Sequence, residues 1–165
     1  MFRAKSLLLA LAAVATAFAA AVLATSGAGI NAVVHARAAF VNAVDIKIKV
    51  DDGHQEVLHV PNARDTVMQQ IVVEPRGHTG WHSHPGPAIA LVKSGQLTLY
   101  SGDDRKCVGR TYSAGQAFVD SGQGHVHLGA NLSFTTSTEI WVTYLDVPPG
   151  GSPRIDQADP GNCAF

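Results

Sequence analysis

The sequence predicts an all-β fold, a β-sandwich or barrel built from short strands. Short apolar segments recur at steady spacing after the first forty residues, and glycine- or proline-containing turns separate them. No segment in this part of the chain shows the apolar period of a helix. The chain has 165 residues, which fits one domain, and we place that domain at residues 44–147.

Residues 1–38 are predicted to be an export signal that precedes the domain. A short basic start leads into an almost wholly apolar run from Ser6 to Ala24, which is typical of a secretory signal. Small residues that suit cleavage follow at Ala24–Gly29 and at Ala36–Ala38. An uncleaved membrane-anchor helix is the alternative, because a span needs ~20 apolar residues and this run is only slightly shorter. We expect a secreted or cell-envelope protein that contacts the membrane only through this segment, if it is retained.

The first predicted strands lie on the N-terminal side of the domain. Residues 44–50 alternate between apolar and polar side chains, which is the period of a half-buried strand. After a turn, residues 56–60 form a second short strand that ends at Pro61. Residues 66–74 form a longer strand, which we expect the segment Pro75–Gly77 to break.

The second half of the domain contains more strands of the same kind, each followed by a turn. We expect these strands at residues 88–93, 96–101, 106–112, 116–120, 125–131 and 133–147. The proline- and glycine-rich segment that follows cannot continue a sheet. Residues 148–165 are therefore predicted to form an irregular C-terminal tail.

Cys107 and Cys163 are the two cysteines of the chain, and an oxidising compartment would permit a disulfide between them. Such a bond would hold the C-terminal tail, and for a loop of this length the chain-entropy model gives ~4 kcal/mol of stabilisation. Two free thiols are the alternative. A cysteine metal site is not expected, because the chain has no Cys-x-x-Cys spacing.

Four of the eight histidines form two His-x-His pairs, His82 with His84 and His125 with His127. Residues two apart in a strand point to the same side, so each pair can aim both imidazoles at one point. Neutral imidazole is a ligand for iron, zinc, manganese, nickel and copper. Three such ligands with open coordination positions are typical of a catalytic metal site. The alternative is that these histidines are turn and surface residues.

With these histidines the sequence resembles the cupin family, a small RmlC-like jelly roll, also described as a double-stranded β-helix. The first cupin motif runs from a glycine through His-x-His to an acid and a further glycine. The second runs from a glycine through Pro-x-Gly to His-x-x-x-Asn, and Ser113 stands here where proline is usual. The matching segments are His82–His84 and Gly95 for the first motif, and Gly109, Ser113–Gly115 and His127–Asn131 for the second.

The resemblance covers roughly residues 44–147 and implies that His82, His84 and His127 are metal ligands. It also identifies a departure. The acid of the first motif should fall four residues after His84, and this chain has Ala88 there. Either the site uses three histidines only, or another residue supplies a fourth ligand.

His125 is the best candidate for that fourth ligand by strand parity, and a place on the rim of the pocket is the alternative. Glu74 and Glu139 are the carboxylates with a comparable chance of pointing inward. Ala88 and Ala90 share a strand face and would leave space near the metal if that face lines the pocket.

Trp81 is a further candidate pocket residue, although such residues are more often part of a core. Asn131 is expected to brace the strand of the second motif rather than bind metal. The remaining histidines, at positions 35, 54, 59 and 78, carry no spacing argument.

The resemblance implies two functions. Three-histidine sites without a carboxylate are similar to those of thiol dioxygenases and diketone-cleaving dioxygenases, which predicts a metal-dependent oxidoreductase acting on a small chelating molecule. The alternative is a non-catalytic cupin that binds a metal or a small ligand. Cupins are often dimers, so a homodimer is compatible with the resemblance. Nucleic acid is not an expected partner, because the chain without residues 1–38 has 9 basic and 13 acidic side chains and no basic patch.

Overall fold

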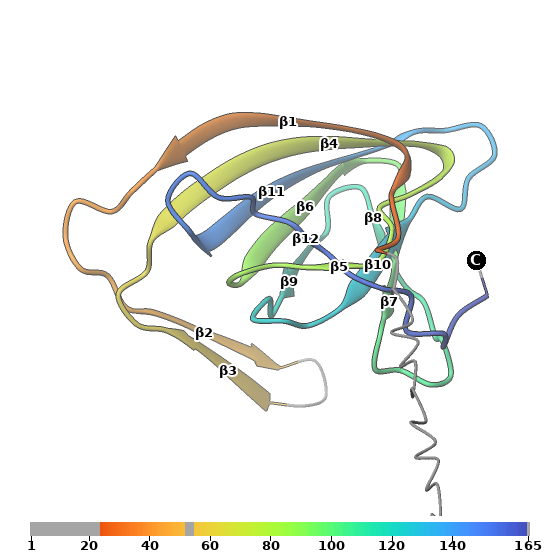
Figure 1. Cartoon of the computed structure of the whole chain (residues 1–165). Coiled ribbons are helices and arrows are strands. Elements are labelled where there is room, and N and C mark those ends of the chain that lie inside the picture. Colours follow the sequence, from red (N-terminus) through yellow and green to blue (C-terminus); the bar gives the residue numbers. More distant parts are fainter. Residues whose placement is uncertain (1–23, 52–54, 165) are drawn as a thin grey trace, which may run out of the picture.

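The computed structural model describes residues 24–51 and 55–164. The apolar run of the predicted export signal lies outside these ranges. All assigned elements in the described part are strands (Figure 1), and no helix there is long and apolar enough to cross a membrane. The all-β prediction is confirmed. The strands are β1 (Ala28–Ala38), β2 (Ile46–Asp51), β3 (Gln55–Val60), β4 (Asp65–His78), β5 (His82–Ser83), β6 (Ala88–Ser94), β7 (Gln96–Ser101), β8 (Arg110–Ser113), β9 (Ala117–Asp120), β10 (His127–Ala130), β11 (Thr138–Val147) and β12 (Ile155–Asp156).

Most of these strands belong to one antiparallel sheet that curls into a nearly closed barrel (Figure 1). Its strand order is β12-β5-β10-β4-β11-β6-β9, with β1 added to β4, and β7 joining β10 to β8. The strands β2 and β3 form a separate two-stranded sheet. The antiparallel barrel fits the predicted jelly roll.

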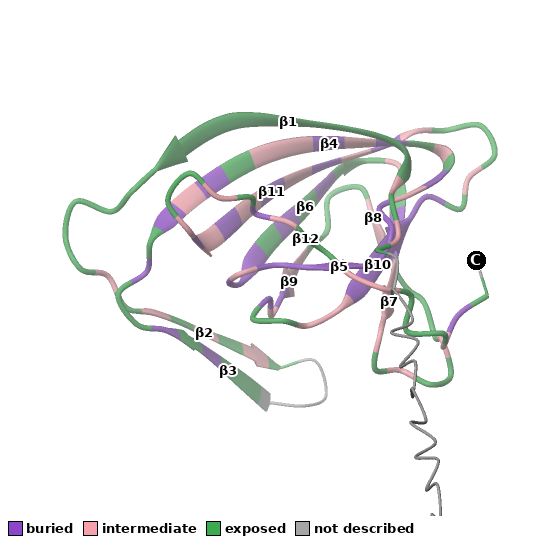
Figure 2. Cartoon of the chain, in the orientation of Figure 1, coloured by how far each residue is buried: buried purple, intermediate pink, exposed green. Residues whose placement is uncertain are grey.

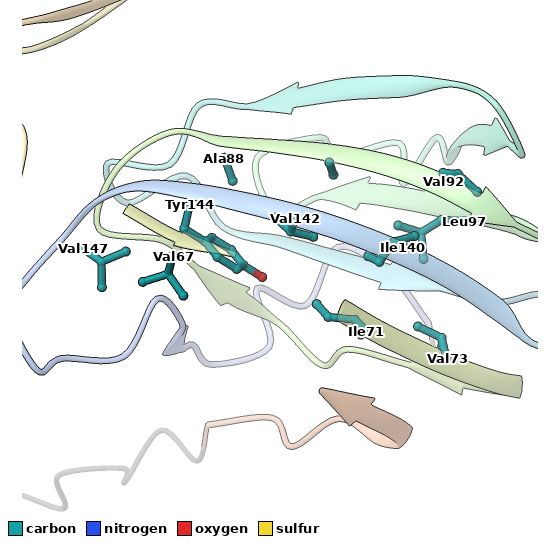
Figure 3. Packing of buried hydrophobic residues seen from close by; sticks show 11 residues of the cluster. Val67, Ile71, Val73, Ala88, Val92, Leu97, Ile140, Val142, Tyr144 and Val147 are labelled. Carbon is teal, nitrogen blue, oxygen red and sulfur yellow. The ribbon is translucent and has the colours of Figure 1, made fainter. Parts of the chain in front are cut away.

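The hydrophobic core lies inside the barrel, between β4, β6 and β11 (Figure 3). Buried residues alternate with more exposed ones along β11, as expected for a strand with one face on the core. Val67, Val73 and Val142 are among the side chains that meet there. Burying each such side chain contributes ~1.5–3 kcal/mol, so this packing fixes the frame on which the site is built.

Strand β4 continues to His78 and is not broken at Pro75, so the predicted end of this strand was wrong. A bulge accommodates the proline: Ile30 pairs with Val73 and Ala28 pairs with His78 across the irregular segment. Arg76 has a φ of 62°, in the left-handed region, and its N–H donates to the carbonyl of Ser133. The extension brings the end of β4 beside the histidine loop.

Strand β1 lies within the segment that the sequence assigned to export. It pairs with β4 along its length, and Figure 2 shows it exposed throughout. His35 belongs to this strand, where its ring stacks on Trp141 with centroids 4.8 Å apart. Both faces of β1 are exposed, so its sequence lacks the alternation that identifies a half-buried strand. A cut after residue 38 would remove β1, whereas a cut at Ala24–Gly29 would leave most of it.

The C-terminal tail is held to the barrel. The predicted disulfide between Cys107 and Cys163 is present, with Cα atoms 5.3 Å apart. The amide of Asn162 also donates to the carbonyls of Ser101 and Asp104, at 2.8 and 2.7 Å. The tail is not wholly irregular as predicted, because residues 155–156 form β12 against β5.

Candidate metal centre

The paired strands β5 and β10 bring the predicted histidines together. His82 and His127 are direct partners in the register, so their side chains lie on one face, with ring centroids 4.3 Å apart. His84 follows β5, and its ring lies 4.9 Å from that of His82 and 5.0 Å from that of His127. Their ligating atoms all lie within 4.8 Å of one another.

Backbone carbonyls fix the orientation of two of these rings. His82 Nδ1 lies 2.9 Å from the carbonyl oxygen of Gly80, and His84 Nδ1 lies 2.7 Å from that of Pro153. A carbonyl oxygen only accepts hydrogen bonds, so each Nδ1 carries the proton and each Nε2 keeps its lone pair free. This is the usual arrangement around histidines that bind a metal.

Burial keeps all three rings neutral at pH 7. His82, His84 and His127 are 6%, 4% and 6% exposed. Burial, together with the neighbouring histidines, lowers the pKa of His82 to about 2 and, despite Asp120, that of His127 to about 4. Burial also lowers the pKa of His84 below its ordinary value. Three neutral, converging imidazoles fit a divalent transition metal with open coordination positions.

His125 does not join the three-histidine group. It precedes β10 in a turn, where its N–H donates to the carbonyl of Gly122, so the strand-parity argument does not apply to it. Its Nδ1 lies 3.1 Å from Asp120 Oδ2, and its Nε2 lies 2.8 Å from Ser101 Oγ. The hydrogen bond with Asp120 raises the pKa of His125. His125 lines a groove beside the centre, as the rim alternative expected.

Asp120 is the site residue that the sequence did not identify. It is 8% exposed, and its Oδ2 lies 3.1 Å from Nδ1 of both His125 and His127. The contact with His127 is close in distance but is not aligned as a hydrogen bond. Burial would raise the pKa of Asp120, but the hydrogen bond from His125 and the nearby His127 lower it well below the usual range. Asp120, His125 and His127 form a second close group of candidate ligands.

Neither of the predicted carboxylates lies at the centre. Glu74 accepts a hydrogen bond from Ser137. Glu139 accepts hydrogen bonds from Gln70, Lys93 and Trp141. Both acids point away from the barrel interior, because side chains that share a face alternate along a strand and their β4 and β11 neighbours fill the core. The suggestion that these two carboxylates could point inward was therefore wrong.

The three histidines line an internal cavity of about 40 Å³. Ala88 and Ala90 line it as predicted, beside apolar side chains and Tyr144, whose hydroxyl donates to Gln69 Oε1 at 3.1 Å. Trp81 does not line it. It is 1% exposed and packs with Leu128, Ala130 and Cys163 in a separate core cluster, so its assignment to the pocket was wrong and the core alternative holds.

A larger groove of about 410 Å³ lies on the other side of His127. Its wall includes β7, β8 and the β2–β3 hairpin, with Ser101, Arg110 and Glu56 among the polar side chains. His127 and Asp120 border both spaces. The three histidines therefore face a narrow, mostly apolar interior, and His127 also borders a wider groove with both polar and apolar walls.

No family model and no curated protein matches this sequence. Three solved structures illustrate the similarity. The first is an oxalate oxidase (24% identity, 49% of this chain and 41% of that chain covered, TM-score 0.42). The second is the polyketide cyclase RemF from Streptomyces resistomycificus (20%, 58% and 64%, 0.45). The third is a cupin-like protein from Thermotoga maritima (21%, 57% and 65%, 0.45).

These structural neighbours are cupin-family proteins. The chain spans about two fifths of the length of the oxalate oxidase. All three similarities have identities below 25% and TM-scores below 0.5.

Proposed function

We propose that this protein binds a divalent transition metal through His82, His84 and His127. The observation that carries this proposal is the convergence of three buried, neutral imidazoles, two of them with Nδ1 held by a backbone carbonyl. Iron, zinc, manganese, nickel and copper all accept imidazole nitrogen. The identity of the metal is left to measurement.

The proposed activity is that of a dioxygenase-type oxidoreductase acting on a small chelating molecule. A metal held by three protein ligands would polarise a bound substrate and bring reactants together. The internal cavity of about 40 Å³ has room only for molecules of the size of a few waters. A chelating organic molecule would need more room, and the larger space next to the centre is the groove of about 410 Å³ that His127 and Asp120 border.

The narrow interior also favours a second candidate function, a non-catalytic protein that holds a metal or a small ligand on a metal. The same three histidines serve either function. For localisation we propose a secreted or cell-envelope protein. The disulfide between Cys107 and Cys163 supports this, because such bonds persist in oxidising compartments.

Elemental analysis of the exported protein tests the metal proposal. We expect about one transition-metal ion per chain, and loss of that ion in His82→Ala and in His127→Ala. His59→Ala is the matched control, since His59 is exposed on β3 and remote from the group. Unchanged metal content in both site variants would contradict the proposal.

Oxygen uptake separates the two candidate functions. The metal-loaded protein is offered thiols, diketones and catechol-type phenols in turn. Bound iron with substrate-dependent uptake supports the oxidoreductase. Tightly bound zinc with no uptake for any of the three classes supports the binding protein.

A further inference from the structure

A carboxylate faces the centre from the strand next to the one where the first cupin motif would place it. Ala88 on β6 and Asp120 on β9 are direct partners in the antiparallel register, so they share a face, and both line the internal cavity. We propose that Asp120 is the carboxylate of the metal centre and positions His127 for binding. This inference rests on the proposed three-histidine metal site.

The carboxylate of Asp120 is oriented by its own turn. Its Oδ1 accepts a hydrogen bond from the N–H of Gly122 at 2.8 Å, which leaves Oδ2 directed at the two histidines. Gly122 has a φ of +60°, and a Cβ at this position would lie 1.9 Å from the carbonyl oxygen of Gly86. Only glycine fits there, so the turn holds Asp120 against the loop that carries His84.

Asp120 provides the hydrogen-bond acceptor beside Nδ1 of His127, as backbone carbonyls do for Nδ1 of His82 and His84. In the described part of the chain, Asp120 Oδ2 is the acceptor 3.1 Å from His127 Nδ1, and this nitrogen has no aligned hydrogen-bond partner. A small rotation of the ring would align the pair. An Nδ1–H directed at Asp120 leaves Nε2 as the ligand atom and makes it more basic.

The charge of Asp120 also matters. Hydrogen bonds to an ionised carboxylate are about twice as strong as those between neutral groups. Three neutral imidazoles do not offset the charge of a divalent ion, and the acid absent at position 88 would have done so. Asp120 supplies a buried negative charge that contacts the proposed ligand His127 instead of the metal itself. The small side chain of Ala88 leaves room for the carboxylate of Asp120 on the neighbouring strand.

Metal affinity of the chelator-stripped protein tests this role, with Zn(II) and Co(II) as probes in competition with a chromophoric chelator. We expect Asp120→Ala to weaken binding about 10- to 100-fold. Asp120→Asn, which keeps the shape and loses the charge, should weaken it less. The interchange variant Ala88→Asp with Asp120→Ala should recover part of the loss. Glu56→Gln is the matched control, because Glu56 lines the same groove from β3 with an exposed side chain and lies outside the chain of hydrogen bonds that links Asp103, Ser101 and His125 to Asp120.

The Co(II) absorption spectrum adds a readout that a loss of stability alone would not change. We expect it to shift in Asp120→Ala because His127 is no longer held in one orientation. Wild-type affinity and spectrum in a folded Asp120→Ala protein would overturn the inference. If Asp120→Ala does not fold, a metal affinity equal to that of the wild type in Asp120→Asn would overturn the inference instead.

Two further results are distinguishable. Binding of two ions per wild-type chain, with only the second lost in Asp120→Ala, would make Asp120 and His125 ligands of a separate ion and overturn the positioning role. Absence of metal from the wild-type protein would instead overturn the proposed function itself.

Discussion

Burial decides the protonation of the histidines at the centre. The pKa of His82 falls to about 2 and that of His127 to about 4, while the pKa of His84 falls below its ordinary value. In the unfolded chain the same rings have the ordinary pKa of about 6.5. The folded protein therefore holds its ligands ready for a metal at a pH where exposed histidines bind protons.

This difference predicts how the stability of the metal-free protein depends on pH. Between about pH 4.5 and 6.5 the unfolded chain binds protons at these three rings, whereas the folded chain keeps His82 and His127 mostly neutral and lowers the pKa of His84 in the same direction. The free energy of unfolding should therefore rise with pH. Each ring contributes up to ~1.4 kcal/mol per pH unit. His125 acts in the opposite direction, because its raised pKa stabilises the fold at low pH, so the net effect is smaller than three rings would give.

Denaturant unfolding at pH 4.5, 5.5 and 6.5 with a chelator present measures this slope. His127→Gln should flatten this slope, because glutamine does not titrate. A free energy of unfolding that is constant or that falls across this range would contradict the burial argument.

Individual residues also show what the sequence could and could not predict about the site. The His-x-His spacing pointed to the two histidine pairs, and the resemblance to the cupin motifs selected His82, His84 and His127 from them as the proposed ligands. Asp120 was not, because its relation to Ala88 depends on the register between two strands that no local pattern specifies. Strand parity could not place His125, because β10 begins only at His127, two residues later.

At the scale of elements, the C-terminal tail is part of the centre. Strand β12 pairs with β5 on the side away from β10, and the carbonyl of Pro153 orients His84. Gln157 adds hydrogen bonds to the carbonyl of Trp81 and to Ser83 Oγ. A proline-rich segment predicted to be an irregular tail thus clamps the strand that carries His82, with the disulfide fixing its end.

Removal of the disulfide should therefore affect both stability and metal binding. The double variant Cys107→Ser with Cys163→Ser is expected to lose about 2–5 kcal/mol of unfolding free energy. Its metal affinity should also fall, because the acceptor for His84 Nδ1 is held less firmly. Urea unfolding and chelator competition measure the two effects. A lowered stability with unchanged affinity in the folded variant would show that the tail does not support the ligand.

The existence of the long strands was predictable, but the ends of some strands depend on neighbouring segments. The long strands β4, β6 and β11 were predictable from their apolar, β-branched and aromatic residues between turns, and in the structure each has one face on the core. The continuation of β4 past Pro75 depends on the bulge opposite β1. Strand β8 begins at Arg110, later than predicted, because the preceding residues form the turn that holds Cys107.

At the scale of the molecule, the barrel places the centre between two unequal spaces. The interior is almost filled by its own side chains, and the groove outside His127 is about ten times larger. The jelly-roll fold was predictable from strand spacing and motifs. The division between the two spaces was not, because it depends on which side chains from distant strands fill the barrel.

Strand β1 extends the folded unit beyond the predicted domain boundary. Its Arg37 forms contacts that are expected to stabilise the barrel. Arg37 Nη1 lies 3.2 Å from Oδ2 of the buried Asp65 and also donates to the carbonyl of Pro148 at 3.3 Å. Its Nη2 donates to the carbonyl of Gly151. Without β1, Asp65 would lose the guanidinium that pairs with it.

A chain that begins at residue 39 is therefore expected to be less stable than one that begins at residue 24. Loss of the charged hydrogen bond alone accounts for ~1.5–3 kcal/mol, and the backbone pairing with β4 adds to it. Urea unfolding of the two chains measures the difference, and Arg37→Gln in the longer chain isolates the part due to Asp65. If the proposed export includes cleavage, N-terminal sequencing should find the cut before residue 28, because a cut after residue 38 would remove a strand that stabilises the barrel. Equal stability of the two chains, or a mature protein that begins at residue 39, would show that β1 is dispensable.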